Sequence, residues 1–188
     1  MMKEKLIRKI QEFQPYNEQE AVDKATLLNL LAEDTDLSVR DNLIAHLTAS
    51  AWVVNPERTK VLMAYHNLYN SWAWLGGHAD GNYDLAAVAE KEAREETGIE
   101  NVKLVSDDIL SLEILTVNGH EKKGKYVPSH LHLNCTYLLE ADPDAPIRIK
   151  EDENSQVGWI DFVDVVNKST EPWFVERIYS KLCTKSYK

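Results

Sequence analysis

Apolar residues at the start of the chain recur every three or four positions. Four of them fall within residues 3–13: Leu6, Ile7, Ile10 and Phe13. This spacing places them on one face of a helix. After a break at Pro15, Asn17 with Glu20 three residues later is typical of the start of a second helix. We therefore expect two amphipathic helices at the beginning of the chain.

From residue 46 onward, apolar and polar positions alternate with a period of two, which is the pattern of β-strands. Strands are predicted over residues 46–54, 60–66, 101–106, 110–120, 129–141 and 157–163. A closing helix is expected over residues 171–182, with Pro172 in its first turn. Another helix is expected between the second and third strands. Antiparallel hairpins around one central helix indicate an α+β layer architecture.

The pattern indicates a single domain over residues 1–188, with a helical extension at 1–45 and a core at 46–188 that includes the closing helix. It contains no repeat, low-complexity stretch or linker that would separate two domains. The extension could cover the sheet, form a homodimer interface or shape a substrate pocket. Packing against the core is the default among these roles.

The chain is acidic, with 21 Lys and Arg against 31 Asp and Glu and a formal net charge of −10. This balance argues against binding to duplex nucleic acid, which requires a cationic surface. The two cysteines, Cys135 and Cys183, belong to no metal or disulfide motif. The charged N-terminus lacks the apolar core of a signal peptide, and no apolar run is long enough to span a membrane. We expect a cytoplasmic protein that does not bind membranes.

Half of the net charge lies in residues 80–100, largely on the predicted central helix at 85–97. At about 100° per residue, three glutamates continue the apolar stripe that begins at Leu85: Glu92, Glu95 and Glu96. Like charges on an inward face repel one another and are costly to remove from water. A divalent cation would compensate, and carboxylate oxygens suit Mg²⁺. The pattern therefore favours a metal site over a solvated acidic face.

The residues around the glutamates fit such a helix. Asp84 is a good N-cap, and Gly98 is a good left-handed stop. Glu90 and Arg94 point away from the stripe, at the spacing of a solvent-exposed ion pair. The Gly76-Gly77 pair would let the backbone approach a ligand or metal closely, although alone it would more often mark a simple turn.

Residues 76–99, GGHADGNYDLAAVAEKEAREETGI, resemble the Nudix box, the sequence motif of Nudix hydrolases. Gly77 takes the first glycine of the motif, and residues 91–99 take its second half. Trp72 matches a Trp often found ahead of the glycines. The resemblance covers residues 72–100 directly, with looser similarity from 46 to 165, and a match this long and ordered is specific.

Two positions of the box depart from the family pattern. Tyr83 stands where the motif has Glu, and Lys91 stands where it has Arg, so the pair that usually braces the loop against the helix is absent. Asp80 or Asp84 could pair with Lys91 instead, although Lys lacks the bidentate fork of Arg. Leu75 replaces a frequent Pro. The metal-binding half of the motif is intact.

The resemblance implies a Nudix αβα sandwich with a mixed sheet, preceded here by the helical extension. It also implies hydrolysis of a phosphoanhydride bond in a nucleoside diphosphate linked to another moiety, with Mg²⁺ or Mn²⁺ as cofactor. The implied metal ligands are Gly77 through its carbonyl, Glu92, Glu95 and Glu96. The proton acceptor could be Glu92, Glu95 or, on a later loop beside Glu151 and Asp152, Glu153. A solvated acidic turn is the plainer explanation of that later loop.

Aromatic residues and one histidine near the box are candidates for substrate binding. His78 directly follows Gly77 and is well placed to contact the substrate. Trp74, Tyr69 and Tyr83 could stack on a base, although large aromatics more often belong to a core or wall.

Two further histidines lie on a later predicted strand. His130 and His132 share one face with Asn134 and Thr136, whereas Cys135 lies on the opposite, apolar face. The histidines could line the cleft and contact phosphate or base. A solvated sheet face explains them equally well.

Two other functions remain open from the sequence. Tyr83 and Lys91 raise the alternative of a catalytically weak Nudix-fold nucleotide-binding or regulatory module, although a decayed site would have no reason to retain three inward glutamates. An isoprenoid diphosphate isomerase on the same fold would require a positioned Cys, which the apolar setting of Cys135 disfavours. Substrate identity stays open, because nucleoside diphosphate sugars, ADP-ribose, dinucleoside polyphosphates and oxidised nucleotides share the diphosphate.

Overall fold

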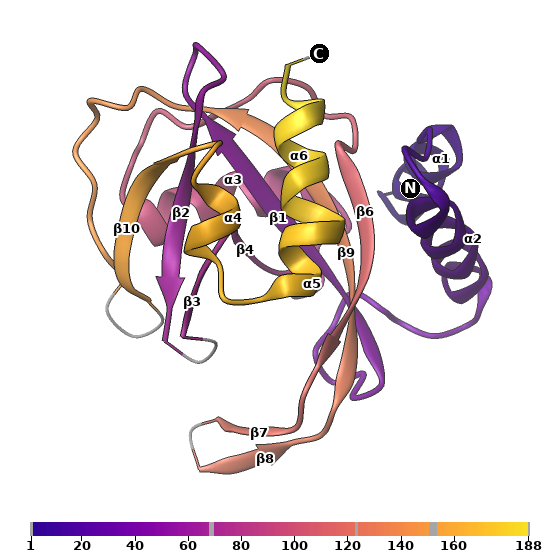
Figure 1. Cartoon of the computed structure of the whole chain (residues 1–188). Helices are drawn as coiled ribbons and strands as arrows, with labels where there is room; N and C mark the ends of the chain where they lie inside the picture. The colour runs from indigo at the N-terminus through magenta and orange to yellow at the C-terminus, as the bar shows by residue number, and fades with distance from the viewer. Residues whose placement is uncertain (1, 68–69, 123, 151–153, 188) are drawn as a thin grey trace.

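The computed structural model describes residues 2–67, 70–122, 124–150 and 154–187. Figure 1 shows its helices and strands. The helical segments are α1 Met2–Glu12, α2 Glu18–Ala32, α3 Leu85–Thr97, α4 Val165–Lys168, α5 Pro172–Phe174, a π-helical turn Val175–Tyr179 and α6 Ser180–Lys185. The strands are β1 Ala45–Val54, β2 Lys60–His66, β3 Ser71–Ala73, β4 Leu75–His78, β5 Lys103–Leu104, β6 Ser111–Val117, β7 His120–Lys122, β8 Lys125–Val127, β9 His130–Glu140 and β10 Asn154–Asp161.

Most of the strands join one mixed sheet. Its main path runs β10-β2-β1-β9-β5, with β3 beside β2, β4 beside β1 and β6 beside β9. β1 and β9 are parallel, and their register pairs His46 with His132 and Thr48 with Asn134. β7 and β8 form a separate hairpin, which projects from the body of the molecule (Figure 1). The parallel pair brings residues from the two halves of the chain together.

The two faces of β1 differ in chemistry. On the face covered by α3, small and branched apolar residues such as Leu47 and Ala49 are buried along the strand. On the opposite face, Trp52 and Val54 pack with residues of the C-terminal helices, which lie in front of the sheet in Figure 1. Because side chains alternate between faces, the polar residues of β1 lie on this second face, beyond the apolar part. That polar area forms the floor of a cleft.

The ends of α3 agree with the sequence. Asp84 accepts a hydrogen bond from the backbone N–H of Ala87 at 3.3 Å, and Gly98 has a left-handed φ of 70°. Glu90 and Arg94 form the predicted ion pair at 2.7 Å. These features fix where the helix starts and which side of it faces the sheet.

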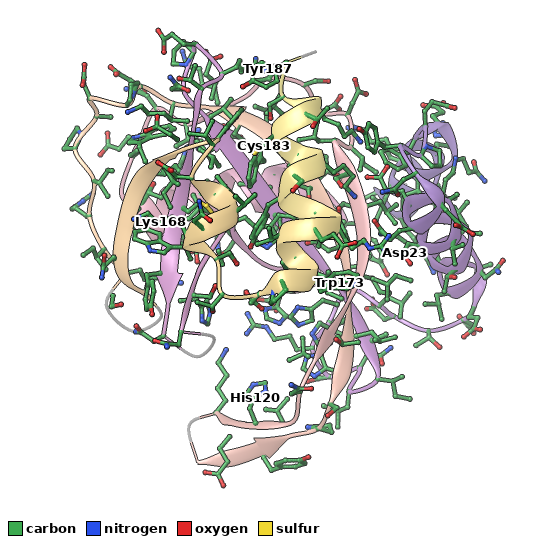
Figure 2. All side chains as sticks on the ribbon, viewed as in Figure 1. Asp23, His120, Lys168, Trp173, Cys183 and Tyr187 are labelled. Carbon is green, nitrogen blue, oxygen red and sulfur yellow. The ribbon has the colours of Figure 1, made fainter. Side chains whose placement is uncertain are left out.

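The N-terminal helices pack beside β6 (Figure 1). Apolar residues of both helices belong to the same core as the sheet: Leu6, Ile10, Leu27 and Leu31. Asp23 of α2, labelled in Figure 2, accepts the backbone N–H of Ile114 at 3.1 Å. Gln19 donates to the carbonyl of Leu112 at 3.2 Å. The extension therefore covers one edge of the core.

A buried ion cluster joins α2, β6 and α6. The Lys181 ammonium lies 2.8 Å from the Glu20 carboxylate and 3.1 Å from that of Glu113, and all three side chains are buried. Burial alone would raise the pKa of Glu20, but the hydrogen bond and charge of Lys181, with further help from Lys185, lower it overall. The cluster holds α2 and α6 against the same strand, β6.

The α+β class, the mixed sheet and the N-terminal helices are confirmed. Element ends differ from the prediction: residues 101–106 contribute only β5, and a π-helical turn interrupts the closing helix. β3 and β4 are too short for a period of two to reveal them, and they form by pairing with β2 and β1. No helix in the described ranges is both long and apolar enough to cross a membrane.

Candidate functional site

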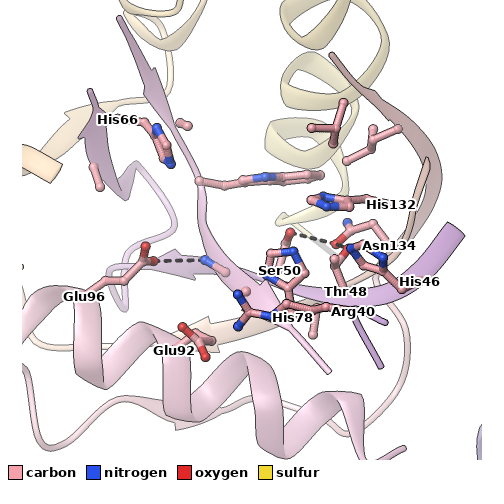
Figure 3. A pocket seen from close by; sticks show the side chains of 18 of the residues that line it. Arg40, His46, Thr48, Ser50, His66, His78, Glu92, Glu96, His132 and Asn134 are labelled. Atoms are coloured by element: carbon pink, nitrogen blue, oxygen red, sulfur yellow. Dashed lines mark hydrogen bonds between the residues drawn. The ribbon is translucent and has the colours of Figure 1, made fainter. Parts of the chain in front are cut away.

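A cleft of ≈ 880 Å³ opens beside the first half of β1. Its walls come from the turn before β1 and from β2, β4, α3, β6 and β9. Two groups of residues line its opposite ends (Figure 3). We call the first the carboxylate end: Gly76, Gly77, Glu92, Glu95 and Glu96. We call the second the histidine end: His46, His78, His130 and His132.

Glu96 connects α3 to the glycine strand β4. Its side chain is buried, and one carboxylate oxygen accepts the backbone N–H of Gly76 at 3.0 Å (Figure 3). The other oxygen accepts the side-chain amide of Asn154 at 3.4 Å. Glu96 therefore fixes the position of the glycine strand relative to the helix, in addition to contributing negative charge.

Glu92 lies directly against Gly77. A Cβ atom at position 77 would stand 2.6 Å from the carboxyl carbon of Glu92, which no real side chain allows. The Glu92 side chain is 14% exposed and keeps its carboxylate in the cleft. A side chain at position 77 would therefore displace the Glu92 side chain from its present place.

Glu95 and Lys91 lie at the outer edge of the carboxylate end. The Glu95 side chain is 46% exposed, more than the inward stripe predicted, because it lies at the margin of that stripe. The Lys91 ammonium lies 3.0 Å from Glu95 and 3.3 Å from Glu92. The expectation that Lys91 pairs with Asp80 or Asp84 is wrong. The hydrogen bond from Lys91 to Glu95 and the neighbouring carboxylates raise the pKa of the lysine.

The histidine end is formed by three strands. His46 comes from β1, His78 from β4, and both His130 and His132 from β9, with neighbouring ring centroids 4.8–5.1 Å apart. Burial lowers the pKa of His78 to about 3 and that of His132 to about 2, and it also lowers the pKa of His46. At neutral pH these rings carry no charge.

The floor between the two ends is a buried polar network centred on Asn134. Its side-chain oxygen accepts hydroxyl protons from Thr48 at 3.0 Å and Ser50 at 2.9 Å. Its amide group donates to Glu113 and to Thr136, both at 3.1 Å. All four hydrogen-bonding positions of the amide are used. The interpretation of this strand face as solvated is wrong, because Asn134 and Thr136 are buried.

The predicted aromatic residues lie in different places. Trp74 lines the cleft and packs edge-on against Tyr179, with ring centroids 5.7 Å apart. Tyr83 does not line the cleft: its hydroxyl donates to Asp36 at 2.9 Å, in the segment that follows α2. Tyr69 lies outside the described residues. The structure thus separates Tyr83 from the other substrate-binding candidates.

Sequence reasoning missed several cleft residues. Arg40 forms a bidentate pair with Asp80, with both N–O distances at 2.6 Å, and this pair lines the cleft. Asn154 and His46 also line it. Arg40, Asn154 and His46 all lie outside the Nudix box in the sequence, and only the tertiary fold brings them to the cleft. Glu153, the proposed base on a later loop, lies outside the described residues, as do Glu151 and Asp152.

Cys135 is fully buried on the apolar side of β9, as its strand position predicts. Burial, with a smaller contribution from Glu113, raises the pKa of its thiol. The cleft therefore receives no thiol from this residue, and the isomerase alternative loses its nucleophile.

Comparison with known proteins agrees with the fold. The family model described as NUDIX domain matches residues 45–182. An RNA pyrophosphohydrolase from Pelagibacter ubique (strain HTCC1062) is 31% identical over 120 residues, which is 61% of this chain and 76% of the relative. The crystal structure of a MutT protein from Methanosarcina mazei Go1 superposes with a TM-score of 0.51 at 17% identity, covering 76% of this chain and 95% of that one.

A second solved structure, an Ap4A hydrolase binary complex from C. elegans, matches with a TM-score of 0.49 at 19% identity, over 74% of this chain and 93% of the other. The chain belongs to the Nudix hydrolase family. The predicted family, and with it the prediction of an enzyme, is confirmed.

Proposed function

We propose that the chain hydrolyses a phosphoanhydride bond in a nucleoside diphosphate linked to another moiety, using Mg²⁺ or Mn²⁺ at the carboxylate end. The observation that supports this most directly is the contact between Gly77 and Glu92 at the wall of a cleft of ≈ 880 Å³. The Glu92 carboxylate and the Gly77 backbone thus lie together at a space large enough for a substrate. The relative from Pelagibacter ubique, whose name specifies pyrophosphate hydrolysis, supports the same bond.

The carboxylate end has the donor set that a hard divalent cation prefers. Glu92, Glu95 and Glu96 supply carboxylate oxygens, and Gly77 would add its carbonyl. The side chains of Glu92 and Glu96 are largely removed from water. The Lys91 ammonium partly neutralises Glu92 and Glu95. A bound cation would reduce the repulsion that remains among the three carboxylates.

Different residues of the cleft would have different roles in the reaction. A bound Mg²⁺ or Mn²⁺ would neutralise charge on the diphosphate oxygens and lower the pKa of a bound water. Glu96 holds the glycine strand through the N–H of Gly76. Arg40 lies at the cleft with its guanidinium beside Asp80, where it can meet a phosphate group. Trp74 offers an apolar wall for a base or sugar.

A proton acceptor is also needed, and Glu92, Glu95 and Glu153 remain the candidates. Both α3 candidates accept a hydrogen bond from Lys91, but the Glu95 side chain is much the more exposed of the two. We therefore favour Glu92 or Glu153 as the proton acceptor. Glu95 would then act only as a metal ligand. His78, His130 and His132 line the other end of the same cleft, where their rings can contact the nucleoside or phosphate part of the substrate.

A second candidate substrate is an RNA that carries a pyrophosphate group, which the printed name of the Pelagibacter ubique relative suggests. The net charge of −10 disfavours extended contact with a nucleic-acid backbone. A small nucleotide derivative therefore remains the preferred substrate class. The alternative of a nucleotide-binding module without turnover rests on Tyr83 and Lys91, and it predicts binding of the same ligands with no product.

The test is a panel of small nucleoside diphosphate derivatives and a pyrophosphate-bearing RNA, assayed with Mg²⁺ and Mn²⁺ for release of phosphate or nucleotide. Wild type should turn over at least one small-molecule substrate, and Glu92→Gln should lower kcat by about 10²–10³-fold. Glu90→Gln is the matched control, because Glu90 lies on the same helix in a pair with Arg94.

Glu90→Gln should retain wild-type turnover. Tight binding of a panel member by wild type without product would support the regulatory module instead. Equal activity of Glu92→Gln and Glu90→Gln would contradict the proposed site.

A further inference from the structure

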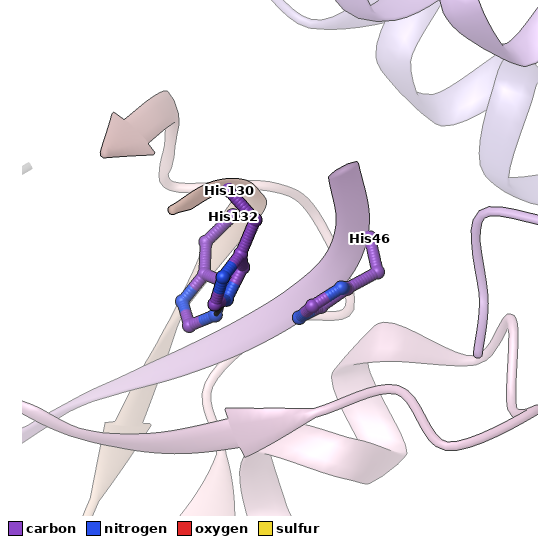
Figure 4. Close-up of side chains that lie close together, drawn as sticks. All are labelled: His46, His130 and His132. Atoms are coloured by element: carbon purple, nitrogen blue, oxygen red, sulfur yellow. Dashed lines mark hydrogen bonds between the residues drawn. The ribbon is translucent and has the colours of Figure 1, made fainter. Parts of the chain in front are cut away.

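Four of the six histidines of the chain gather at the histidine end. The parallel register pairs His46 of β1 directly with His132 of β9, and His130 lies two residues before His132 on the same strand face. The three rings point toward one another (Figure 4). One ring nitrogen of each lies within 4.8 Å of those of the other two. This convergence is separate from the carboxylates of α3.

The hydrogen bonds of two of these rings determine which nitrogen has a free lone pair. His46 Nδ1 lies 3.0 Å from the carbonyl oxygen of Asn42, and His130 Nδ1 lies 2.8 Å from that of Pro128. A carbonyl oxygen only accepts, so both Nδ1 atoms donate. In a neutral imidazole the Nε2 atom then bears the lone pair. A backbone carbonyl on the other nitrogen is the usual partner of a metal-ligating histidine.

His46 Nε2 is the atom that this arrangement leaves unexplained. It is buried away from solvent and has no hydrogen-bond partner among the described residues. The His46 side chain as a whole is only 4% exposed. Buried polar atoms without a partner are rare in folded proteins. The lone pair of this nitrogen points into the cluster with His130 and His132 (Figure 4).

His130 and His132 alone could be satisfied without a metal. Their Nε2 atoms lie 3.1 Å apart, so His132 can donate a proton to the lone pair of His130. That hydrogen bond would satisfy the Nε2 atoms of His130 and His132. It supplies no donor for the Nε2 atom of His46. For His132 to become a ligand through the same nitrogen, its proton moves to Nδ1, and the ring remains neutral.

We propose that His46, His130 and His132 form a second metal site, which takes Zn²⁺ or another late first-row transition metal. Three imidazole nitrogens suit such ions and not Mg²⁺. At Zn–N distances of about 2.0–2.1 Å, tetrahedral ligand nitrogens lie about 3.3 Å apart. The His130–His132 separation of 3.1 Å is already close to that value.

Three protein ligands leave a fourth position of a tetrahedral ion. Because all three histidines line the cleft, that position is available to water or to an oxygen or nitrogen atom of a molecule bound there. The site would also join the first residues of β1 to those of β9. Its ligands include none of the carboxylates of the carboxylate end, although His130 and His132 are also among the residues proposed to contact the substrate.

The experiment is a calorimetric titration of the metal-free full chain with Zn²⁺ in excess Mg²⁺, which occupies the carboxylate end. Wild type should bind one Zn²⁺ per chain, and His46→Gln and His132→Gln should each weaken binding at least about tenfold. His66→Gln is the matched control, because His66 lines the same cleft outside the three-histidine cluster. That variant and Glu92→Gln should both bind Zn²⁺ as wild type does.

X-ray absorption on the zinc-loaded wild type keeps the proposal testable if a variant fails to fold. Imidazole nitrogens at about 2.0–2.1 Å are expected in the first shell. Zinc should also raise the melting temperature of wild type and leave that of a folded His46→Gln variant unchanged. A shell of oxygen atoms only, loss of zinc binding in Glu92→Gln, or no zinc binding in excess Mg²⁺ would overturn the proposal.

Discussion

The two ends of the cleft are built in different ways. Every member of the carboxylate end lies between Gly76 and Glu96, on one strand and the helix that follows it. The histidine end joins His46 to His132 through the parallel pairing of β1 and β9. A site of the first kind leaves a contiguous motif in the sequence, whereas a site of the second kind becomes visible only after the strands are paired.

The ends also differ in charge. The carboxylate end holds three acidic side chains with Lys91 as a partial counter-charge. At the histidine end, burial holds the pKa values of His78 and His132 well below their ordinary range, so these two rings are neutral at pH 7. Oxygen donors with negative charge and neutral nitrogen donors select different metals. Two ions of different chemistry could therefore occupy one cleft.

The largest effect should come from the buried carboxylate of Glu96. Glu96→Gln should lower metal-dependent turnover by about 10³-fold and leave the fold intact. The new amide oxygen can still accept the N–H of Gly76. The Asn154 NH₂ group now faces Glu96, so the new NH₂ group can donate to the Asn154 side-chain oxygen once the Asn154 amide turns over. Thermal unfolding and kcat measured together test this. Unchanged turnover would contradict the role of Glu96 in the site.

The histidine end should depend more on the N-terminal helices than the carboxylate end does. The polar network next to it runs from Asn134, on the same strand as His130 and His132, through Glu113 to Lys181 and Glu20. Glu20→Gln breaks this buried ion cluster and should lower the free energy of unfolding by about 3–5 kcal/mol at pH 7. The exposed Glu18 on the same helix provides the matched control, since Glu18→Gln should have little effect.

The same pair of variants gives a pH test. Because the pKa of Glu20 is lowered in the folded state, its contribution is fully present above the unfolded value of 4.5 and is lost as pH falls through the folded pKa. The difference in unfolding free energy between wild type and Glu20→Gln should therefore shrink below pH 4.5. Urea titrations across this range measure it, and a constant difference would contradict the assignment.

A smaller effect is expected from the close approach at Gly77. Gly77→Ala places a methyl group 2.6 Å from the carboxyl carbon of Glu92 and should displace that carboxylate. A displacement near 1 Å can reduce turnover by about 10²-fold. In Gly158→Ala the added carbon would meet Trp72 at an ordinary 3.7 Å, so its activity should match wild type. Steady-state kinetics of the two variants compares them, and equal activity would mean that the contact at Gly77 does not matter.

The helix repeat and two capping residues predicted that Glu92 and Glu96 face inward from α3, and the structure has both side chains there because these signals are local. The sequence overstated the burial of Glu95, which lies at the margin of the inward stripe. It also assigned Tyr83 to substrate binding from its position in the box, whereas Asp36 of the preceding segment holds its hydroxyl outside the cleft. That contact depends on how the N-terminal extension packs, which no local pattern encodes.

The histidine end was only half predicted. His130 and His132 appeared as one strand face, but whether that face was wet or buried depends on the neighbours that β6 and the terminal helices supply. His46 carried no signal of its own, because a histidine at the start of a strand is ordinary. Parallel pairing over more than eighty intervening residues, which the sequence pattern does not specify, gives it its partners.

Anomalous diffraction from crystals soaked with Mn²⁺ and Zn²⁺ together tests the separation of the two ends most directly. Data collected on either side of each metal's absorption edge distinguish the ions. We expect manganese beside Glu92 and Glu96 with the carbonyl of Gly77, and zinc between His46, His130 and His132. Both metals at the carboxylate end, or no manganese there, would contradict this expectation.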